Sequence, residues 1–441
     1  MKNSRRTFLK QSSLVLAGAG SAAFVPQHVM ASHIIGANEK VRIGVIGCKG
    51  MGFSNLRAHL KLDNVECAAL CDVDGQVLEQ RTAEVEEMTG QRPLNYRDYR
   101  KMLENKDIDA VIIGTPDHWH CLIMVDACEA GKDVYVEKPI ANSIAECDLM
   151  VKAAKHYNRV VQVGQWQRSD QHWTDAVNYV QSGKLGKIRL VKAWAYMGWM
   201  KDIPVKPDKP APEWVDYDMW LGPAPKRPFN ENRFHFTFRW FWDYAGGLMT
   251  DWGVHLIDMA LYGMNATAPT SVMASGGKLA YPEDASETPD TLQTVYEFDG
   301  FNMLWEHGVG INGGPYGRDH GVAFIGNLGT LVVDRGKWEV IPEQEEGKYK
   351  TEAIPVQYRS GESGLDLNAK NFIECIKSRA TPRTNIEIGR LAAVTAHLGN
   401  VAYKTGRKVY WDAAKGEFKD DAEANAYIVP EYHNAWKLPN V

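Results

Sequence analysis

Short apolar runs alternate with longer amphipathic runs between residues 41 and 165, and this alternation restricts the possible folds more than any other feature of the chain. Runs such as VRIGVIG from Val41 and AVIIG from Ala110 have the length and composition of strands that are buried on both faces. The runs between them carry apolar residues at helical spacing. The pattern predicts a doubly wound α/β domain with a parallel sheet, which we place at residues 38–165.

The first strand leads into the glycine-rich turn GCKGMG at residues 47–52. Dinucleotide-binding turns carry glycine at the first, third and sixth places, so that the chain turns sharply, approaches the pyrophosphate and packs its helix close to the strand. Here Lys49 takes the third place, so the match is incomplete; its side chain either offsets phosphate charge or points to solvent, and we favour solvent. The expected pyrophosphate-binding residues are Gly47, Lys49, Gly50, Met51 and Gly52.

The second strand ends at Asp72, which follows the glycine turn at the distance typical of the acid that binds the ribose hydroxyls of NAD. A carboxylate there repels the 2′-phosphate of NADP, and residues 73–75 contain no arginine. The sequence therefore favours NAD over NADP. The alternative is that Asp72 caps the next helix.

A later strand ends in the charged corner Glu137-Lys138-Pro139, within GKDVYVEKPIANS. The strand delivers Lys138 to the carboxyl edge of the sheet, where ligands bind, and Pro139 biases Lys138 toward an extended backbone. An ammonium held there can hydrogen-bond an oxygen that loses its proton as hydride leaves the adjacent carbon. A solvated lysine is the alternative. Whether the Lys138-Pro139 bond is cis stays open at this point.

A second polar pair, Asp251 and His255, stands four residues apart in GGLMTDWGVHLID, so both side chains share one face of a helix. A histidine can take a hydroxyl proton near neutral pH, and Asp251 can orient the ring or the substrate and favour the protonated imidazole. Three other interpretations remain: a surface ion pair, a core histidine, or two ligands of a metal site whose third ligand is missing.

With its dinucleotide turn, GTPDHWH after one strand and VEKP after the next, the chain resembles the glucose-fructose oxidoreductase, inositol dehydrogenase and MocA family (Gfo/Idh/MocA) over nearly all of residues 32–441. In that family the Glu-Lys-Pro lysine contacts substrate, and an Asp and a His flank a glycine on a helix. Both motifs match here. The resemblance implies that Lys138, Asp251 and His255 are catalytic.

The resemblance also implies a C-terminal α/β domain with an open, mainly antiparallel sheet that forms the substrate floor and often an oligomer face. We expect this substrate and oligomerisation domain at residues 166–365, with a proline-rich insertion at 203–228 and a single strand at 322–333. Residues 366–441 are expected to form C-terminal helices and a tail, and a helix at about 384–405 is expected to complete the nucleotide domain.

Other candidate residues surround these motifs. Thr115 and Pro116 resemble the family turn that lines the nicotinamide, and Glu137 is expected beside them. His118 and His120 either contact the cofactor or only cap and pack. Gln165 and Arg168 at the domain junction either bind sugar hydroxyls or bridge the domains. The remaining candidates, Arg239, Trp240 and Trp242, offer aromatic faces suited to sugar rings, with core packing as the alternative.

The first 31 residues have the features of a twin-arginine export signal: Arg5-Arg6, an apolar run, and the small-x-small site Val29-Met30-Ala31. We therefore expect a periplasmic or extracytoplasmic protein, with no membrane insertion of the mature chain. Removing the signal leaves 46 basic residues against 55 acidic ones, a net charge of −9, which argues against a nucleic-acid partner. The seven cysteines lack disulfide or zinc spacing, so we expect buried free thiols and no metal site.

Together these features predict an NAD-dependent oxidoreductase that acts on a secondary hydroxyl of a sugar, polyol or glycoside, and assembles as a dimer or tetramer through its C-terminal sheet. An exported enzyme has no free nicotinamide pool, so the cofactor is expected to be tightly held and reset within the site. One alternative is an NAD-recycling glycoside hydrolase or lyase that works by transient oxidation. A non-catalytic sugar-binding protein is a third possibility.

Overall fold

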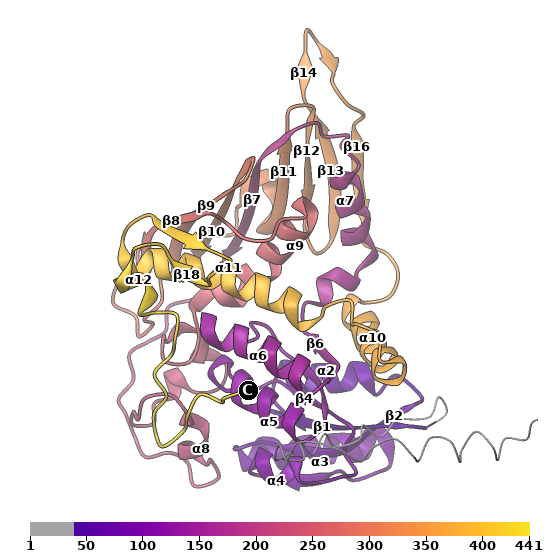
Figure 1. The fold of residues 1–441 in the computed structure, drawn as a ribbon, viewed down its shortest axis with the longest axis vertical. Helices are drawn as coiled ribbons and strands as arrows, with labels where there is room; N and C mark the ends of the chain where they lie inside the picture. The colour runs from indigo at the N-terminus through magenta and orange to yellow at the C-terminus, as the bar shows by residue number, and fades with distance from the viewer. Residues whose placement is uncertain (1–38) are drawn as a thin grey trace, which may run out of the picture. The chain divides into compact units, whose positions relative to one another are not determined.

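The computed structural model describes residues 39–441, so the expected export signal at residues 1–31 lies outside the described residues. Two sheets organise the described chain, one of six strands and one of ten (Figure 1). A two-stranded hairpin, β14 (Gln344–Glu345) and β15 (Lys348–Tyr349), extends beyond the larger sheet. The arrangement confirms the prediction of a doubly wound parallel sheet followed by an α/β domain with an open sheet.

The six-stranded sheet is parallel and has the order β3-β2-β1-β4-β5-β6. This is the strand order of dinucleotide-binding folds, in which the crevice for the ligand opens where the order reverses, between β1 and β4. The sequence pattern did not predict the short strand β3. The strands are β1 (Val41–Ile46), β2 (Val65–Cys71), β3 (Leu94–Tyr96), β4 (Ala110–Ile113), β5 (Asp133–Val136) and β6 (Val161–Val163).

Helices connect these strands, and their N-terminal caps follow from local sequence. Asp74 caps α3 by accepting hydrogen bonds from the backbone amides of Gln76 and Val77, and Ser143 caps α6. The capping alternative for Asp72 is therefore wrong, because Asp74 has that role. The helices are α2 (Met51–His59), α3 (Gly75–Thr89), α4 (Tyr99–Leu103), α5 (Asp117–Glu129) and α6 (Ile144–His156).

The larger sheet is antiparallel except where β7 and β10 pair in parallel, and its order is β16-β13-β12-β11-β7-β10-β9-β8-β17-β18. Helices α7 (Gln171–Gln181) and α9 (Val254–Met264) cover one face (Figure 1). The strands are β7 (Ile188–Met197), β8 (Ser271–Gly277), β9 (Thr291–Phe298), β10 (Phe301–Val309), β11 (His320–Gly326), β12 (Gly329–Val333), β13 (Lys337–Pro342), β16 (Ile354–Tyr358), β17 (Val409–Asp412) and β18 (Glu417–Phe418).

The prediction of a single strand at residues 322–333 is wrong. The chain turns at Asn327-Leu328 between two glycines, and β11 then pairs antiparallel with β12, with Val322 opposite Val333. Both strands bury apolar side chains, so the apolar pattern continues through the turn and conceals it. The glycine-flanked asparagine was the available turn signal.

Two C-terminal helices return to the first half of the chain. Helix α10 (Gly364–Ser378) packs against α2, and α11 (Ile386–Thr405) packs against α6 and β6 as well as α9 and β8. The expected helix at about 384–405 thus contacts elements of both sheets, and not only those of the nucleotide domain.

The segment between β7 and α9 contains the expected insertion and reaches back to the smaller sheet. We call residues 203–235 the strap; it contains α8 (Tyr217–Leu221) and η2 (Glu231–Arg233). The amide of Gly75 donates to the carbonyl of Trp214 at 2.8 Å, and the amide of Asp216 donates to the carbonyl of Val73 at 2.9 Å. The strap is therefore hydrogen-bonded to the residues that directly follow Asp72.

All seven cysteines are buried and unpaired, as the sequence predicted. Among residues 39–441, none of the helices combines the length and the apolar character that crossing a bilayer requires. In the same part of the chain, no three His, Cys, Asp or Glu side chains are grouped so that they could hold a metal ion.

Candidate active site

A cavity of about 390 Å³ opens at the carboxyl ends of β1, β2, β4 and β5. Its size is in the range of small-molecule sites, and its position is the ligand crevice of this fold. The smaller sheet contributes the glycine turn and the strand ends, while the opposite wall comes from α8, the end of the strap and η3 (His235–Trp240).

The glycine turn packs as a dinucleotide turn requires. Gly47 has a φ of +84°, and a Cβ on it would lie 2.6 Å from the backbone nitrogen of Thr115. A Cβ on Gly52 would lie 1.9 Å from the carbonyl oxygen of Gly47, so only glycine lets α2 approach β1 this closely. Lys49 is exposed and lines the cavity, a position that is compatible with both interpretations of its side chain.

Asp72 is fixed in the cavity wall by two backbone amides. Its carboxylate accepts hydrogen bonds from the amides of Cys48 at 2.8 Å and Asp74 at 2.9 Å. Burial raises the pKa of Asp72 to about 6, although these two hydrogen bonds oppose the shift. The acid thus lies at the end of β2 in the place expected for a ribose ligand.

The turn after β4 lines the cavity, but only part of the DHWH motif does. The hydroxyl of Thr115 is buried with no hydrogen-bond partner among the described residues, and Pro116 is the N-cap residue of α5. The ring of His120 lies between the carbonyl oxygens of Pro139 at 2.7 Å and Thr115 at 2.8 Å, so it supports the wall. Burial lowers its pKa to about 4, which keeps the ring neutral.

His118 does not line the cavity, contrary to its place among the expected cofactor residues. Its Nε2 lies 3.1 Å from the carbonyl oxygen of Trp220, and its ring packs against Trp220 and Tyr244. Alternate residues of a helix start face different directions, so His118 packs while His120 lines the site.

Glu137 fixes the corner that presents Lys138. Its buried carboxylate accepts hydrogen bonds from Asn55 at 2.8 Å and from the backbone amide of Lys138 at 3.2 Å. It also borders the cavity. The Lys138-Pro139 bond is cis, which answers the question that the sequence left open.

Lys138 and Asp251, which lie 113 residues apart in the chain, form a partly buried ion pair. The Lys138 ammonium donates to the Asp251 carboxylate at 2.8 Å and to its backbone carbonyl at 2.9 Å. Arg239 donates to the same carboxylate oxygen at 3.2 Å. Burial alone would raise the pKa of Asp251, but Lys138 and Arg239 hold it well below its usual range, so the carboxylate is ionised.

Asp251 lies in η4 (Met249–Gly253), a π-helical turn that continues into α9, and His255 follows in the first turn of α9. Single π turns are frequent at functional sites. His255 is buried, and its Nδ1 has no hydrogen-bond partner among the described residues. Burial, Lys138 and Arg335 lower the pKa of His255 well below its usual value, so the imidazole is neutral.

Asp251 favours the protonated imidazole, as expected, because it raises the pKa of His255. Burial and the two cations Lys138 and Arg335 outweigh this contribution, so the ring is neutral. The Asp251 carboxylate is engaged by Lys138 and Arg239, and its contribution to His255 is electrostatic.

The expected substrate residues separate into different surroundings. Arg168 makes a bidentate ion pair with Asp258 on α9, with its Nη2 2.8 Å from Oδ1, which corresponds to the domain-bridging alternative. Gln165 donates to the carbonyl of Val254 at 3.4 Å, so it touches the start of α9. Both residues connect the two halves of the chain behind the site.

The aromatic candidates also separate. Trp240 is 8% exposed and lines a second cavity, described below. Trp242 lies outside the cofactor cavity: its ring nitrogen donates to the carbonyl of Glu287 at 3.0 Å, and the ammonium of Lys404 lies 4.1 Å from its ring centre.

Sequence reasoning missed Asp117, the first residue of α5. It is 7% exposed and borders the cavity, and no other described residue donates a hydrogen bond to its carboxylate. Burial raises its pKa to about 8, although Arg239 and Lys138 oppose the shift. The motif TPDHWH contained the signal, but an acid at a helix start is ordinarily explained by the helix dipole.

Arg335, in the turn after β12, was also missed. Its guanidinium lies 4.2 Å from the ring centre of Trp252 and 5.0 Å from that of Trp166, and it contributes to the lowered pKa of His255. No motif marks it, because only the fold brings this turn to the catalytic helix.

Family models match both parts of the chain. The Gfo/Idh/MocA model described as the NAD-binding Rossmann fold of an oxidoreductase family covers residues 41–165. The model described as the C-terminal alpha/beta domain of that family covers residues 180–438.

Individual relatives are more distant. "Glycosyl hydrolase family 109 protein 1" of Shewanella sp. (strain ANA-3) is 29% identical over 201 residues, which is 42% of this chain and 44% of the relative, so the match spans less than half of that protein. An aldose-aldose oxidoreductase from Caulobacter crescentus, solved with glycerol, shares the fold with a TM-score of 0.62 at 20% identity over 85% of this chain and 100% of that one. A levoglucosan dehydrogenase solved with NADH and levoglucosan shares the fold with a TM-score of 0.63 at 18% identity, over 84% of this chain and 99% of that one.

Proposed function

The chain belongs to the Gfo/Idh/MocA family of oxidoreductases, and from this premise we propose that it oxidises a secondary hydroxyl of a sugar, polyol or glycoside with NAD. The observation that carries the proposal is the partly buried cluster of Lys138, Asp251 and Arg239 at the carboxyl end of β5, with His255 one helical turn from Asp251. Lys138 and Arg239 line the cavity, while Asp251 and His255 lie behind them, outside its lining.

Each residue has a distinct role in this proposal. The Lys138 ammonium, held by Asp251, donates a hydrogen bond to the substrate oxygen and stabilises the negative charge that develops there. His255 is neutral, so it can accept the hydroxyl proton. Asp251 fixes the position of Lys138, and Arg239 fixes that of Asp251. Partial burial of the cluster strengthens these interactions relative to bulk water.

The residues of the cavity fit NAD, which supplies the hydride acceptor when bound. Gly47 and Gly52 let the turn pack tightly at the start of α2, whose N-terminus would bind the pyrophosphate; Asp72, held by the amide of Cys48, would bind ribose hydroxyls; and the buried hydroxyl of Thr115 has no partner among the described residues. The strap supports tight retention of the cofactor, because it is hydrogen-bonded across the chain at residues 73–75, beside Asp72.

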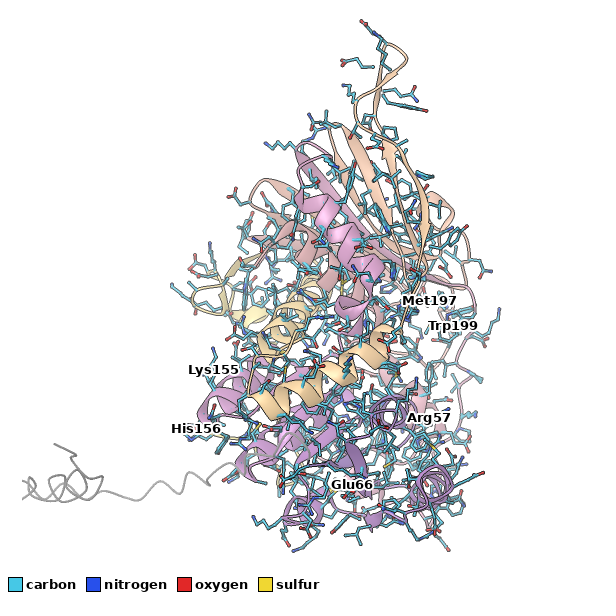
Figure 2. The ribbon with its side chains drawn as sticks, turned by 90° about the vertical axis from the view of Figure 1, so that its right-hand side faces the viewer. Arg57, Glu66, Lys155, His156, Met197 and Trp199 are labelled. Carbon is cyan, nitrogen blue, oxygen red and sulfur yellow. The ribbon has the colours of Figure 1, made fainter. Side chains whose placement is uncertain are left out.

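Replacing Lys138 with alanine tests the proposal. We expect turnover to fall by about 10²- to 10⁴-fold, because the developing charge loses its hydrogen bond, while bound NAD persists. The measurements are sugar oxidation and the amount of nucleotide released on denaturation. Lys155→Ala, at an exposed lysine of α6 (Figure 2), is the matched control. Near-normal turnover in both Lys138→Ala and His255→Asn would exclude the assignment.

A second candidate function is redox-neutral glycoside cleavage, and Asp117 favours it. Oxidation of a sugar carbon to a ketone acidifies the neighbouring C–H. A base takes that proton, the electron pair forms C=C, and the glycosidic C–O bond breaks with its electrons, so that the leaving oxygen takes up a proton. Water then adds across the C=C, and the hydride returns to the ketone carbon. Asp117 provides a second buried acid-base group beside Lys138, with a pKa of about 8. The name of the Shewanella relative is consistent with such an activity.

One assay separates the two functions. A glycosidase liberates aglycone in proportion to time without net NADH, whereas a dehydrogenase given excess free NAD accumulates NADH. We propose export through the signal at residues 1–31 for either enzyme, since a retained cofactor suits a compartment without free nicotinamide. Cell fractionation with and without the Arg5-Arg6 pair checks this.

A further inference from the structure

A second cavity, of about 420 Å³, lies beside the cofactor cavity. Its walls come from residues 199–206, the loop at 281–290 and the segment η3. Phe236 of η3 borders both cavities, and Leu248, at the start of the catalytic helix, borders the second one. The two cavities therefore meet at η3.

Two large aromatic side chains stand open to solvent at this cavity. Trp199 is 59% exposed and Phe236 is 53% exposed, and their ring centres are 6.5 Å apart. Figure 2 shows Trp199 near the outline of the molecule, shortly after Met197 at the end of β7. Neighbouring exposed aromatic faces are costly in water and are suited to the apolar faces of sugar rings.

The polar groups around the cavity divide into two kinds. Asp284 and Asp290 are already engaged: Asp284 accepts from the amide of Ile203, and Asp290 accepts from the amide of Tyr281, so they hold the walls in place. Lys201 and Asp202 at the rim are exposed, and among residues 39–441 neither has a hydrogen-bond or ion-pair partner. The rim thus offers a donor and an acceptor to hydroxyl groups.

Direct contacts link this cavity to the catalytic cluster. Arg239 donates to the Asp251 carboxylate at 3.2 Å and to the carbonyl of Phe236 at 2.9 Å. Its guanidinium also lies 4.7 Å from the Phe236 ring centre. A ligand at Lys138 and a ligand on Phe236 would therefore lie on either side of one arginine.

We propose that the second cavity binds the neighbouring ring of a glycoside whose reacting ring lies at Lys138. This inference rests on the proposed function and narrows its substrate class to glycosides of at least two sugar rings. Trp199 and Phe236 supply the stacking surface, and Lys201 and Asp202 supply the polar contacts at the rim.

Trp199→Ala tests the inference with a panel of maltose, cellobiose and lactose, each compared with the methyl glycoside of its reacting sugar. We expect KM for the disaccharide to rise by about threefold to tenfold, which corresponds to the loss of one stacking contact, with kcat and KM for the methyl glycoside unchanged. Trp199→Phe should restore most of the affinity. Trp214→Ala, an exposed tryptophan of the strap that does not border this cavity, is the control.

Equal effects on both kinds of substrate, or no effect on either, would refute the subsite and leave the oxidoreductase proposal standing. Titration calorimetry with the same disaccharides gives a readout that does not need turnover. If the wild type oxidises none of them but binds one, and Trp199→Ala loses that binding, the subsite stands and oxidation of these disaccharides is refuted. Absence of disaccharide binding refutes the subsite, whereas the oxidoreductase proposal is refuted by the Lys138→Ala and His255→Asn measurements.

Discussion

At the scale of single residues, the partners of each buried group decide its charge. Asp251 has Lys138 and Arg239 within hydrogen-bond distance and is ionised. Asp117 borders the same cavity without such a partner, and burial keeps its carboxyl protonated to about pH 8. His255 is buried near cations and is neutral. The site therefore combines a fixed anion with two groups able to exchange protons.

Asp117→Asn should change how stability depends on pH. The folded-state pKa of about 8 exceeds the unfolded value of about 3.9, so between these values the folded protein binds more protons than the unfolded chain. Increasing the pH therefore destabilises the wild type. We expect the unfolding midpoint of the wild type to fall relative to Asp117→Asn as pH increases from about 5 to about 9. Thermal unfolding of both proteins across this pH range measures the two midpoints.

The control is Asp218→Asn, at an exposed acid in the first turn of α8. It should follow the wild type at every pH. Parallel curves for wild type and Asp117→Asn would show that Asp117 is ionised throughout, despite Arg239, Lys138 and Asp251 as its charged neighbours.

Asp72→Ser should weaken NAD binding and improve NADP binding, because the variant removes the carboxylate that repels a 2′-phosphate. Arg97 also borders the cavity and could then pair with the phosphate, although one of its nitrogens donates to the carbonyls of Val73 and Trp214. The ratio of the two dissociation constants is the measurement. An unchanged ratio would count against the ribose role of Asp72.

At the scale of elements, the strap connects the two functional parts of the chain. It leaves the larger sheet after β7, forms backbone hydrogen bonds at residues 73–75, and ends at His235, whose Nε2 lies 2.9 Å from the Asp74 carboxylate. The same carboxylate group caps α3. The strap thus depends on a helix cap two residues from the proposed ribose ligand Asp72, so its detachment would open the cofactor cavity.

His235→Ala should speed the release of NAD by about tenfold or more, since a hydrogen bond to a charged group contributes about 1.5 to 3 kcal/mol. The exchange of bound NAD for an excess of labelled NAD gives the rate. His156→Ala, an exposed histidine at the end of α6 (Figure 2), should leave the rate unchanged. Equal release rates in the two variants would mean that the strap does not retain the cofactor.

At the scale of the whole molecule, the larger sheet has one covered face and one open face. On the open face Met273, Val295 and Leu304 are neighbours across β8, β9 and β10, and Met273 and Val295 are 51% and 37% exposed. Leu190 and Ile341 lie on the same sheet, and their side chains are 52% and 42% exposed. We propose that a second copy of the chain covers this apolar face, since such patches mark protein interfaces.

Val295→Lys should shift the protein toward monomer, because a charge on each copy would be buried at the centre of the interface. Light scattering coupled to size-exclusion chromatography measures the mass. Val429→Lys, at a 60% exposed valine after the last helix, is the matched control. A wild type that is monomeric, or a Val295→Lys variant that assembles unchanged, would contradict the proposal.

The sequence determined those features that depend on local pattern. Strand and helix periodicity predicted the parallel sheet, the glycine turn and Asp72 predicted the cofactor crevice, and the ends of strand and helix predicted Lys138 and Asp251. These succeed because a strand end or a helix face fixes where a side chain lies, whatever surrounds it.

The tertiary structure alone decided what depends on neighbours distant in the chain. Sequence could not reveal that Arg239 would bind Asp251, that Arg168 would pair with Asp258, or that the insertion would hydrogen-bond the chain beside Asp72. It also could not reveal that Asp117 would be protonated and His255 neutral. Burial and charge partners set a pKa, and both arise only when separate segments of the chain pack together.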